Sequence, residues 1–244
     1  MVPMKRHIPL SGAENFRDLG GYAAEGGSVV MRRVFRADRL TNLTAEDATT
    51  LASMSLKTVI DLRTSAETLR NGPGLLARQT TVLHHSLITS AITLRPTLNY
   101  GEWIGHAREP IAAVFSIMSG ANDPFPLVFH CSAGKDRTGI IAALLLSMLG
   151  VSDTDIIADY ALTRQYFTPT RSPDAQRLHR WHGRMKRIFP DISERISRQL
   201  LDADPITMQE FLATLTSRYG SPIGYLDAIG VGVEARTVIR GRLL

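Results

Sequence analysis

VFHCSAGKDRTGIIAALLLSMLG, residues 128–150, is the stretch that decides the fold of this chain. Its apolar start predicts a short buried strand. The loop 132–137 follows, and a helix that is apolar on every side is predicted to begin near Thr138. A strand, a loop and a buried helix in this order place the loop at the carboxyl end of a sheet and at a helix N-terminus. Free backbone N–H groups and the helix dipole favour an anion at such a place.

The residue types in this loop suit a nucleophile beside a bound phosphate. Five residues separate Cys131 from Arg137, and a loop of that length can curl so that its N–H groups and the guanidinium converge above the sulfur. Arginine holds two phosphate oxygens with a planar fork, and the same positive charge stabilises a thiolate. The alternative is a buried apolar cysteine at a strand end. That alternative leaves five polar or flexible residues unexplained, which are His130, Gly134, Lys135, Asp136 and Arg137.

The sequence HCSAGKDRTG, residues 130–139, resembles the signature of the cysteine-dependent protein tyrosine phosphatase superfamily. It is similar in particular to a branch of bacterial and fungal tyrosine and phosphoinositide phosphatases. The segments NFRDLGGY, residues 15–22, and VIDLR, residues 59–63, are similar to the same branch. Weaker similarities lie in residues 159–162, in residues 224–230 and at Glu234. The resemblance implies a phosphatase-like α/β fold and hydrolysis of phosphate esters.

Length and composition are those of an ordinary globular protein. The 244 residues suit one domain, residues 1–244, and the resemblance implies a helical lid over residues 164–200. The net charge of +5 is mildly basic, and no basic run is long enough to predict nucleic-acid binding. We find no secretory signal and no membrane-spanning segment, and therefore predict a cytoplasmic protein, with secretion by a non-classical route left open. Cys131 is the single cysteine, so no intramolecular disulfide can form.

The order of strand and helix patterns predicts an α/β fold: a central, mostly parallel sheet of about four to five strands with helices on both faces. Besides the strand before Cys131, strands are predicted within residues 28–37, 56–62 and 80–84. Helices are predicted in residues 44–53, 65–69, 97–118 with a break before Pro110, 153–163, 206–219, 221–229 and 234–243. The segment 15–22 is polar and rich in glycine, and it is predicted to be a loop.

Several polar residues outside the signature are candidates for supporting the site. Asp61 and Arg63 end a predicted strand, and the carboxyl ends of strands in an open α/β sheet face the ligand. A plain ion pair between them is the alternative. The resemblance places Arg17 beside the active site. Arg36 and Arg39 are interpreted as solvated, with a position at the mouth of the site as the alternative.

The expected reaction is hydrolysis of a phosphomonoester in two steps. Cys131 attacks phosphorus, and water then releases phosphate from the cysteinyl-phosphate. The loop residues expected to bind phosphate are Ser132, Ala133, Gly134, Lys135 and Arg137. Thr138 is expected to donate its hydroxyl to the sulfur. His130 is expected to order the loop without acting as a base.

The departing oxygen needs a proton donor, and the sequence restricts the choice. No aspartate lies between Leu62 and Asn122, so the donor is Asp136, Asp61 or a glutamate. The resemblance places an aspartate at the position of Asp136, which makes Asp136 the first choice. Asp61 would then orient Lys135 or the loop.

No cofactor is predicted, and no cluster of His or Cys has the spacing of metal ligands. The expected partner is a phosphorylated protein or a phosphoinositide, with neither a nucleic acid nor an integral membrane segment involved. A phosphoinositide or dual-specificity phosphatase on the same site is one alternative to a tyrosine phosphatase. A non-catalytic phosphate-binding adaptor is another, but it would not need Cys131. Thiol redox and sulfur-transfer enzymes often need a second cysteine or another loop length.

Overall fold

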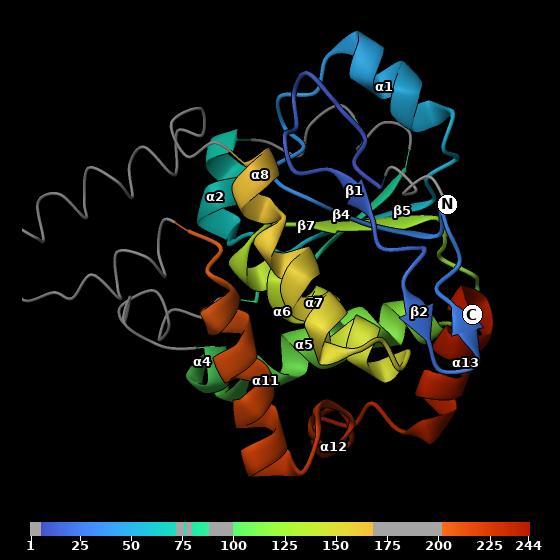
Figure 1. The fold of residues 1–244 in the computed structure, drawn as a ribbon. Coiled ribbons are helices and arrows are strands. Elements are labelled where there is room, and N and C mark those ends of the chain that lie inside the picture. The colour runs from blue at the N-terminus through green and yellow to red at the C-terminus, as the bar shows by residue number, and fades with distance from the viewer. Residues whose placement is uncertain (1–5, 72–75, 77–79, 88–99, 168–201) are drawn as a thin grey trace, which may run out of the picture.

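The computed structural model describes residues 6–71, 76, 80–87, 100–167 and 202–244. A five-stranded sheet forms the centre of the fold, in the order β1-β4-β7-β5-β6 (Figure 1). The strands are β1 Arg17–Asp18, β4 Val34–Ala37, β5 Thr58–Asp61, β6 Thr81–His84 and β7 Leu127–His130. Strands β4, β7, β5 and β6 are parallel, and β1 pairs antiparallel with β4. The predicted mostly parallel sheet is therefore confirmed.

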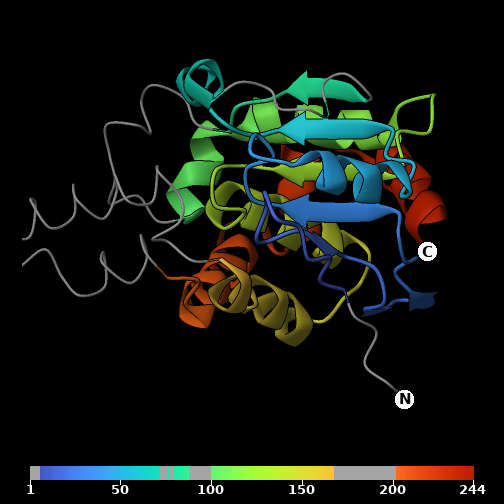
Figure 2. The same cartoon turned by 90° about the horizontal axis from the view of Figure 1, so that it is seen from above.

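The register of the sheet brings three strand ends together. His130, the last residue of β7, lies opposite Ala37 of β4 and Asp61 of β5. The arrows of the long strands point the same way in the view from above (Figure 2). The segments that follow β4, β5 and β7 therefore leave the sheet at one edge, which is where ligands bind in open α/β sheets.

Helices cover both faces of the sheet, as predicted. Helix α1, Ala45–Ala52, lies on one face, and α5, Arg108–Ser119, lies on the other with α6, Asp136–Met148 (Figure 1). Successive side chains of a strand point to opposite faces. Accordingly, Val128 of β7 belongs to the apolar cluster under α1, and Phe129 belongs to the larger cluster around α6.

Helix α6 is the most deeply buried of the helices that the structure describes, and this confirms the prediction from its apolar sequence. It begins at Asp136, two residues before the predicted start near Thr138. Asp136 and Arg137 therefore belong to the first helical turn rather than to the loop. Gly150 follows the helix with a φ of 82°, a conformation that favours glycine and ends the helix.

The other helices agree with the predicted ranges to within a few residues. They are α2 Ser65–Asn71, α4 Tyr100–His106, α7 Asp153–Ala161, α11 Pro205–Tyr219, α12 Pro222–Ala228 and α13 Val233–Leu243. A further short helix, α8 Thr163–Tyr166, follows α7 and was not predicted as a separate helix. Thr44 and Ser152 cap α1 and α7, and their hydroxyl groups accept hydrogen bonds from the N–H groups of Asp47 and Asp155. The break between α4 and α5 lies at Ala107, three residues before Pro110.

Some expectations are corrected and others stay predictions. The segment 15–22, predicted to be a loop, contains the edge strand β1. Two residues long and polar, this strand has no hydrophobic alternation to reveal it. The predicted lid, residues 164–200, lies outside the described residues except for 164–167, and the single domain over residues 1–244 also stays a prediction. None of the helices that the structure describes has the length and hydropathy needed to cross a membrane.

Candidate active site

The loop between β7 and α6 is held close to the end of β4. Cys131 is buried at its start, directly after β7. Gly134 has a φ of 64°, and a Cβ atom at this position would lie 2.6 Å from the carbonyl oxygen of Ala37. Glycine is required here for two reasons: any other residue would be strained at this positive φ, and its Cβ atom would collide with β4.

Three successive carbonyl groups of this loop, residues 132–134, are hydrogen-bonded on its outer side. The first accepts from the backbone N–H of Arg39 at 3.3 Å. The amide of Asn15 donates to the second at 3.1 Å, and Arg36 donates to the third at 2.7 Å. In a planar trans peptide the N–H points away from the carbonyl of the preceding residue. The N–H groups of residues 133–135 are thereby turned to the inner side, which makes a concavity that suits an anion.

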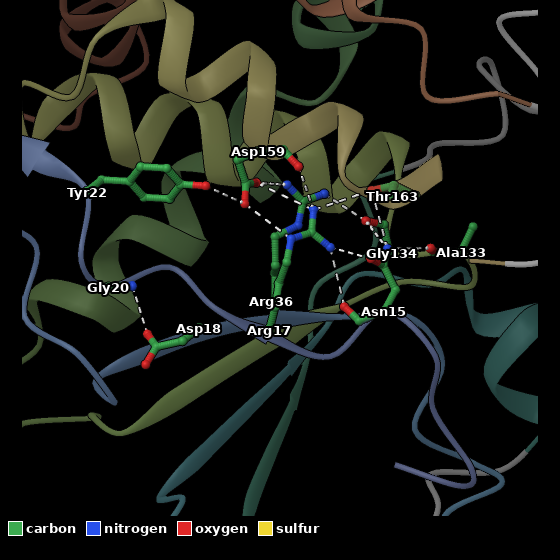
Figure 3. Close-up of polar contacts among 10 residues, drawn as sticks. All are labelled: Asn15, Arg17, Asp18, Gly20, Tyr22, Arg36, Ala133, Gly134, Asp159 and Thr163. Atoms are coloured by element: carbon green, nitrogen blue, oxygen red, sulfur yellow. Dashed lines mark hydrogen bonds and ion pairs between the residues drawn. The ribbon is translucent and has the colours of Figure 1, made fainter. Parts of the chain in front are cut away.

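A buried ion network lies against the outer side of the loop, next to Ala133 and Gly134 (Figure 3). Asp159 of α7 accepts hydrogen bonds from Arg17 at 3.1 Å and from Arg36 at 2.6 Å, and Tyr22 donates to the same carboxylate at 3.1 Å. Arg17 also bonds the side-chain oxygen of Asn15. Burial alone would raise the pKa of Asp159, but the two arginine charges outweigh it and lower the pKa to about 2. We call Arg17, Arg36 and Asp159 the floor network.

The interpretation of Arg36 and Arg39 as solvated is wrong. Arg36 is 1% exposed and Arg39 is 6% exposed. β4 lies between β1 and β7, so Arg36 projects into protein rather than into water. Its partner Asp159 lies 123 residues further along the chain, and the sequence around β4 gives no sign of it. Arg17 lies beside the active-site loop, but behind it, in the floor network.

Arg137 is held by a glutamate that the sequence analysis did not single out. Its two terminal nitrogens lie 2.7 and 2.9 Å from the carboxylate oxygens of Glu67. Glu67 also accepts from the hydroxyl of Ser132 at 2.5 Å and from the N–H of Thr64 at 2.8 Å. Thr64 and Glu67 form a capping pair at the start of α2, and that spacing was the available signal in the sequence.

The Glu67–Arg137 pair is an ionised pair in a buried setting. Burial would raise the pKa of Glu67, but the hydrogen bonds and charge of Arg137 hold it well below the usual range. Burial would likewise lower the pKa of Arg137, but the negative charges of Cys131 and Glu67 raise it above its usual value. The guanidinium is thus permanently charged and fixed within the electrostatic reach of Cys131.

Asp136 is the most open carboxylate of the site. Its side chain is 30% exposed and accepts a hydrogen bond from the hydroxyl of Tyr100 at 2.5 Å. The ammonium group of Lys135 lies 3.3 Å from the same carboxylate. Lys135 is buried and also donates to the carbonyl of Asp202 at 3.2 Å. The ammonium of Lys135 therefore lies inside the protein.

Asp61 is tied into a separate ion pair. Arg63 donates to both of its carboxylate oxygens, at 2.9 and 2.7 Å, and both side chains are buried. The pKa of Asp61, which burial would raise, is lowered by these bonds. The imidazole of His130 lies 3.9 Å from Asp61, and burial lowers the pKa of His130 to about 4. His130 is therefore neutral at pH 7. Asp61 and Arg63 form the ion pair that the sequence offered as the alternative to a role in supporting the site.

Thr138 lies in the first turn of α6 with its hydroxyl fully buried. Among the described residues this hydroxyl has no hydrogen-bond partner, the sulfur of Cys131 included. The donation of Thr138 to the sulfur stays a prediction. In the part of the chain that the structure describes, no group of three or more His, Cys, Asp or Glu residues is placed to hold a metal ion.

The family model and the curated relatives that match this chain give one consistent class. The model of the tyrosine phosphatase family matches residues 8–244. A tyrosine-protein phosphatase of Nostoc commune is 31% identical over 85% of this chain and 73% of its own length. The triple specificity protein phosphatase PtpB of Mycobacterium tuberculosis is 26% identical over 96% of this chain and 98% of its own length. Among solved structures, the Siw14 catalytic core is 16% identical, with a TM-score of 0.43 over 64% of this chain and 79% of that chain.

Proposed function

The chain belongs to the tyrosine phosphatase family, and we propose that it hydrolyses phosphomonoesters at residues 131–137 through a cysteinyl-phosphate intermediate. In the first step the sulfur of Cys131 bonds to phosphorus, and the ester oxygen leaves with a proton from Asp136. In the second step water attacks phosphorus and gives a proton back to Asp136. Phosphate leaves, and the thiolate of Cys131 is regenerated.

The observation that carries this proposal is the orientation of the loop. The carbonyl groups of residues 132–134 are bonded outward, so the following N–H groups point to the opposite, inner side of the loop that begins at Cys131. Preorganised N–H groups and a fixed guanidinium stabilise charge that develops on a transferring phosphoryl group. Arg137, held at the same loop by Glu67, supplies the guanidinium.

The geometry supports Asp136 rather than Asp61 as the proton donor. Asp136 is partly exposed, its shortest contact is a neutral tyrosine hydroxyl, and among the described residues the one cation at its carboxylate is Lys135, 3.3 Å away. Asp61 is buried, and two hydrogen bonds from a guanidinium stabilise its ionised form. A general acid must carry its proton when the substrate is bound, and the ion pair opposes that at Asp61.

The family acts on phosphorylated substrates, and we propose phosphotyrosine in proteins as the main substrate of this chain. The relative from Nostoc commune is named a tyrosine-protein phosphatase, and that from Mycobacterium tuberculosis is named a triple specificity phosphatase. A phosphoinositide or dual-specificity phosphatase is the alternative on the same site. Kinetics with a phosphotyrosine peptide, a phosphoserine peptide and a soluble phosphoinositide separate these cases, because the same loop must accept a different leaving group in each.

The experiment that tests the mechanism is trapping of phosphate on the protein. A ³²P-labelled aryl phosphate is mixed with the wild type, the reaction is stopped in acid, and the labelled peptide is mapped. We expect label on Cys131 in the wild type and none in Cys131→Ser, whose turnover falls at least about 10³-fold. Phosphate binding should survive in Cys131→Ser, because Arg137 and the loop remain. Label on another residue, or a serine variant of near-normal rate, would contradict the mechanism.

Arg137→Lys is the companion variant. A lysine keeps the positive charge but has no planar fork to hold two oxygens and Glu67 together. We expect a rate nearly as low as that of Cys131→Ser. We also expect full wild-type activity in EDTA, since no step uses a metal. A requirement for a divalent ion would move the protein to another mechanistic class.

A further inference from the structure

The contacts of Asp136 are unevenly shared between its two carboxylate oxygens. The hydroxyl of Tyr100 donates to Oδ1 at 2.5 Å, and Nζ of Lys135 lies 3.3 Å from the same Oδ1. Within the described residues, Oδ2 receives no hydrogen bond. The side chain of Asp136 is 30% exposed. One oxygen is therefore held by the protein, and the other is left for substrate or water.

A second tyrosine extends this hydrogen bond into a chain. The hydroxyl oxygens of Tyr100 and Tyr160 are 2.8 Å apart. Tyr100 has one hydroxyl proton and gives it to Asp136, so Tyr160 must be the donor in the contact between the two tyrosines. Both side chains are buried, at 4% and 1% exposure. The donors therefore run in one direction, from Tyr160 to Tyr100 to Asp136.

Both tyrosines keep their protons across the working range of pH. Burial raises the pKa of Tyr100 and of Tyr160 well above 10, and the charge of Asp136 adds to the shift at each. Neither hydroxyl can then serve as the acid or base. They take part only through hydrogen bonds, so the proton that moves is carried by Asp136 itself.

The surroundings fix the two rings in place. Tyr160 lies next to Asp159 on α7, so the residue beside it anchors the floor network. A Cβ atom on Gly139 would come within 3.0 Å of the Tyr160 ring, so the absent side chain lets this ring lie against α6. Tyr100 meets the rings of Tyr160 and Phe211 edge to face, with centroids 6.2 and 5.8 Å away.

We propose that Tyr100 and Tyr160 are positioning residues for the proton transfer: they fix Oδ1 of Asp136 and reserve Oδ2 for the leaving group and for water. This inference rests on the proposed role of Asp136. The proton on Oδ2 passes to the ester oxygen as the P–O bond breaks, and a proton from water returns to Oδ2 as the P–S bond breaks. Two cations lie near this carboxylate. Lys135 lies 3.3 Å from Oδ1 and also donates to the backbone carbonyl of Asp202, whereas Arg137 is paired with Glu67.

The test compares two aryl phosphates of different leaving-group quality in Tyr100→Phe. The variant keeps the ring and its packing and removes only the donor to Asp136. We expect kcat/KM to fall about tenfold or more for phenyl phosphate and less than about threefold for 4-nitrophenyl phosphate, whose leaving group departs with little help. Tyr160→Phe should show the same selectivity to a smaller degree.

Tyr225→Phe is the matched control. Tyr225 is fully buried and its hydroxyl donates to the carbonyl of Ile104 in α4, the helix that carries Tyr100, at 3.0 Å. This change also removes a buried hydroxyl bonded to α4, but it does not touch Asp136. We expect an unchanged ratio of the two rates. An altered ratio of the same size would mean that loosening α4 explains Tyr100→Phe, and would overturn the inference.

A double-mutant cycle separates the inference from the proposed function on which it rests. In an Asp136→Asn background, Tyr100→Phe should cause no further change in the ratio of the two rates. If Asp136→Asn slows phenyl phosphate selectively but Tyr100→Phe slows both substrates equally, the positioning role is contradicted and the assignment of the acid stands. The same holds if the effects of Tyr100→Phe and Asp136→Asn are additive. If Asp136→Asn slows both substrates equally, the assignment of the acid fails, and the inference falls with it.

Discussion

Two carboxylates on either side of the active-site loop are bonded in opposite ways. Asp159, in the floor network, is 1% exposed and is compensated by the charges of Arg17 and Arg36. Asp136 is 30% exposed, and its shortest contact is the neutral hydroxyl of Tyr100. The two guanidinium groups hold Asp159 ionised, whereas the side chain of Asp136 stays open to substrate and water. The comparison separates a region that shapes the loop from a region that takes part in the reaction.

The largest expected effect on stability comes from a substitution in the floor network. Among the described residues, Asp159 is the only carboxylate that Arg17 and Arg36 share, so Asp159→Asn leaves both guanidinium groups buried with excess charge. We expect the free energy of unfolding to fall by about 3–5 kcal/mol, as when one partner of a buried ion pair is removed. Urea denaturation at pH 7 measures the change.

Asp136→Asn is the matched control for that experiment, because it makes the same change in a partly exposed carboxylate of the same site. It should alter the free energy of unfolding by less than about 1 kcal/mol. Equal losses in the two variants would remove the distinction between the two regions.

The pH dependence of stability tests the electrostatics around β7. The pKa of His130 is lowered to about 4 by burial, against about 6.5 in the unfolded chain. Between these values the unfolded chain binds a proton that the native state does not. The contribution of His130 to the free energy of unfolding is therefore complete above pH 6.5, and falls by up to about 3 kcal/mol as the pH drops towards 4.

A second buried group acts in the opposite direction over part of this window. Burial raises the pKa of Asp38 to about 6, so the native state binds its proton more tightly and gains stability as the pH drops from 6 to 4. Subtracting the urea curves of His130→Gln from those of the wild type isolates the histidine. A difference that stays constant from pH 7.5 to 4.5 would contradict a buried neutral His130.

A smaller effect is expected from the backbone of the loop. Gly134 and Gly220 both have positive φ, 64° and 78°, but a Cβ atom collides with β4 only at Gly134. Gly220→Ala should cost about 1 kcal/mol of stability for the backbone strain alone. Gly134→Ala should cost about 1–3 kcal/mol more, because Ala37 cannot move away, and it should lower kcat as the loop shifts. Indistinguishable variants would mean that the loop is not pressed against β4.

The sequence predicted much of the fold because its signals are local. The apolar run before His130 and the caps at Thr44 and Ser152 each lie within a few residues of the element they define. The edge strand β1 was missed because two polar residues have no periodicity. Cys131 and Arg137 could be singled out because only five residues separate them.

The residues that support the site could not be found in the same way. Arg36 was misread as solvated because its partner Asp159 is 123 residues away. Glu67 was missed although its capping pattern with Thr64 was visible, because the pattern predicts a helix start and not a bond to Arg137. Tyr100, 36 residues from Asp136, carries no motif at all. Long-range pairing of buried polar groups is set by the fold, not by neighbouring sequence.

The most direct test of the account is the leaving-group dependence of Asp136→Asn and Asp61→Asn, measured as kcat/KM over a series of aryl phosphates. If Asp136 protonates the leaving oxygen, Asp136→Asn should slow poor leaving groups about 10²-fold or more and good ones far less. Asp61→Asn should then lower all rates by a similar factor, because it disturbs the ion pair with Arg63. Selective loss in Asp61→Asn, or a uniform loss in Asp136→Asn, would contradict the assignment.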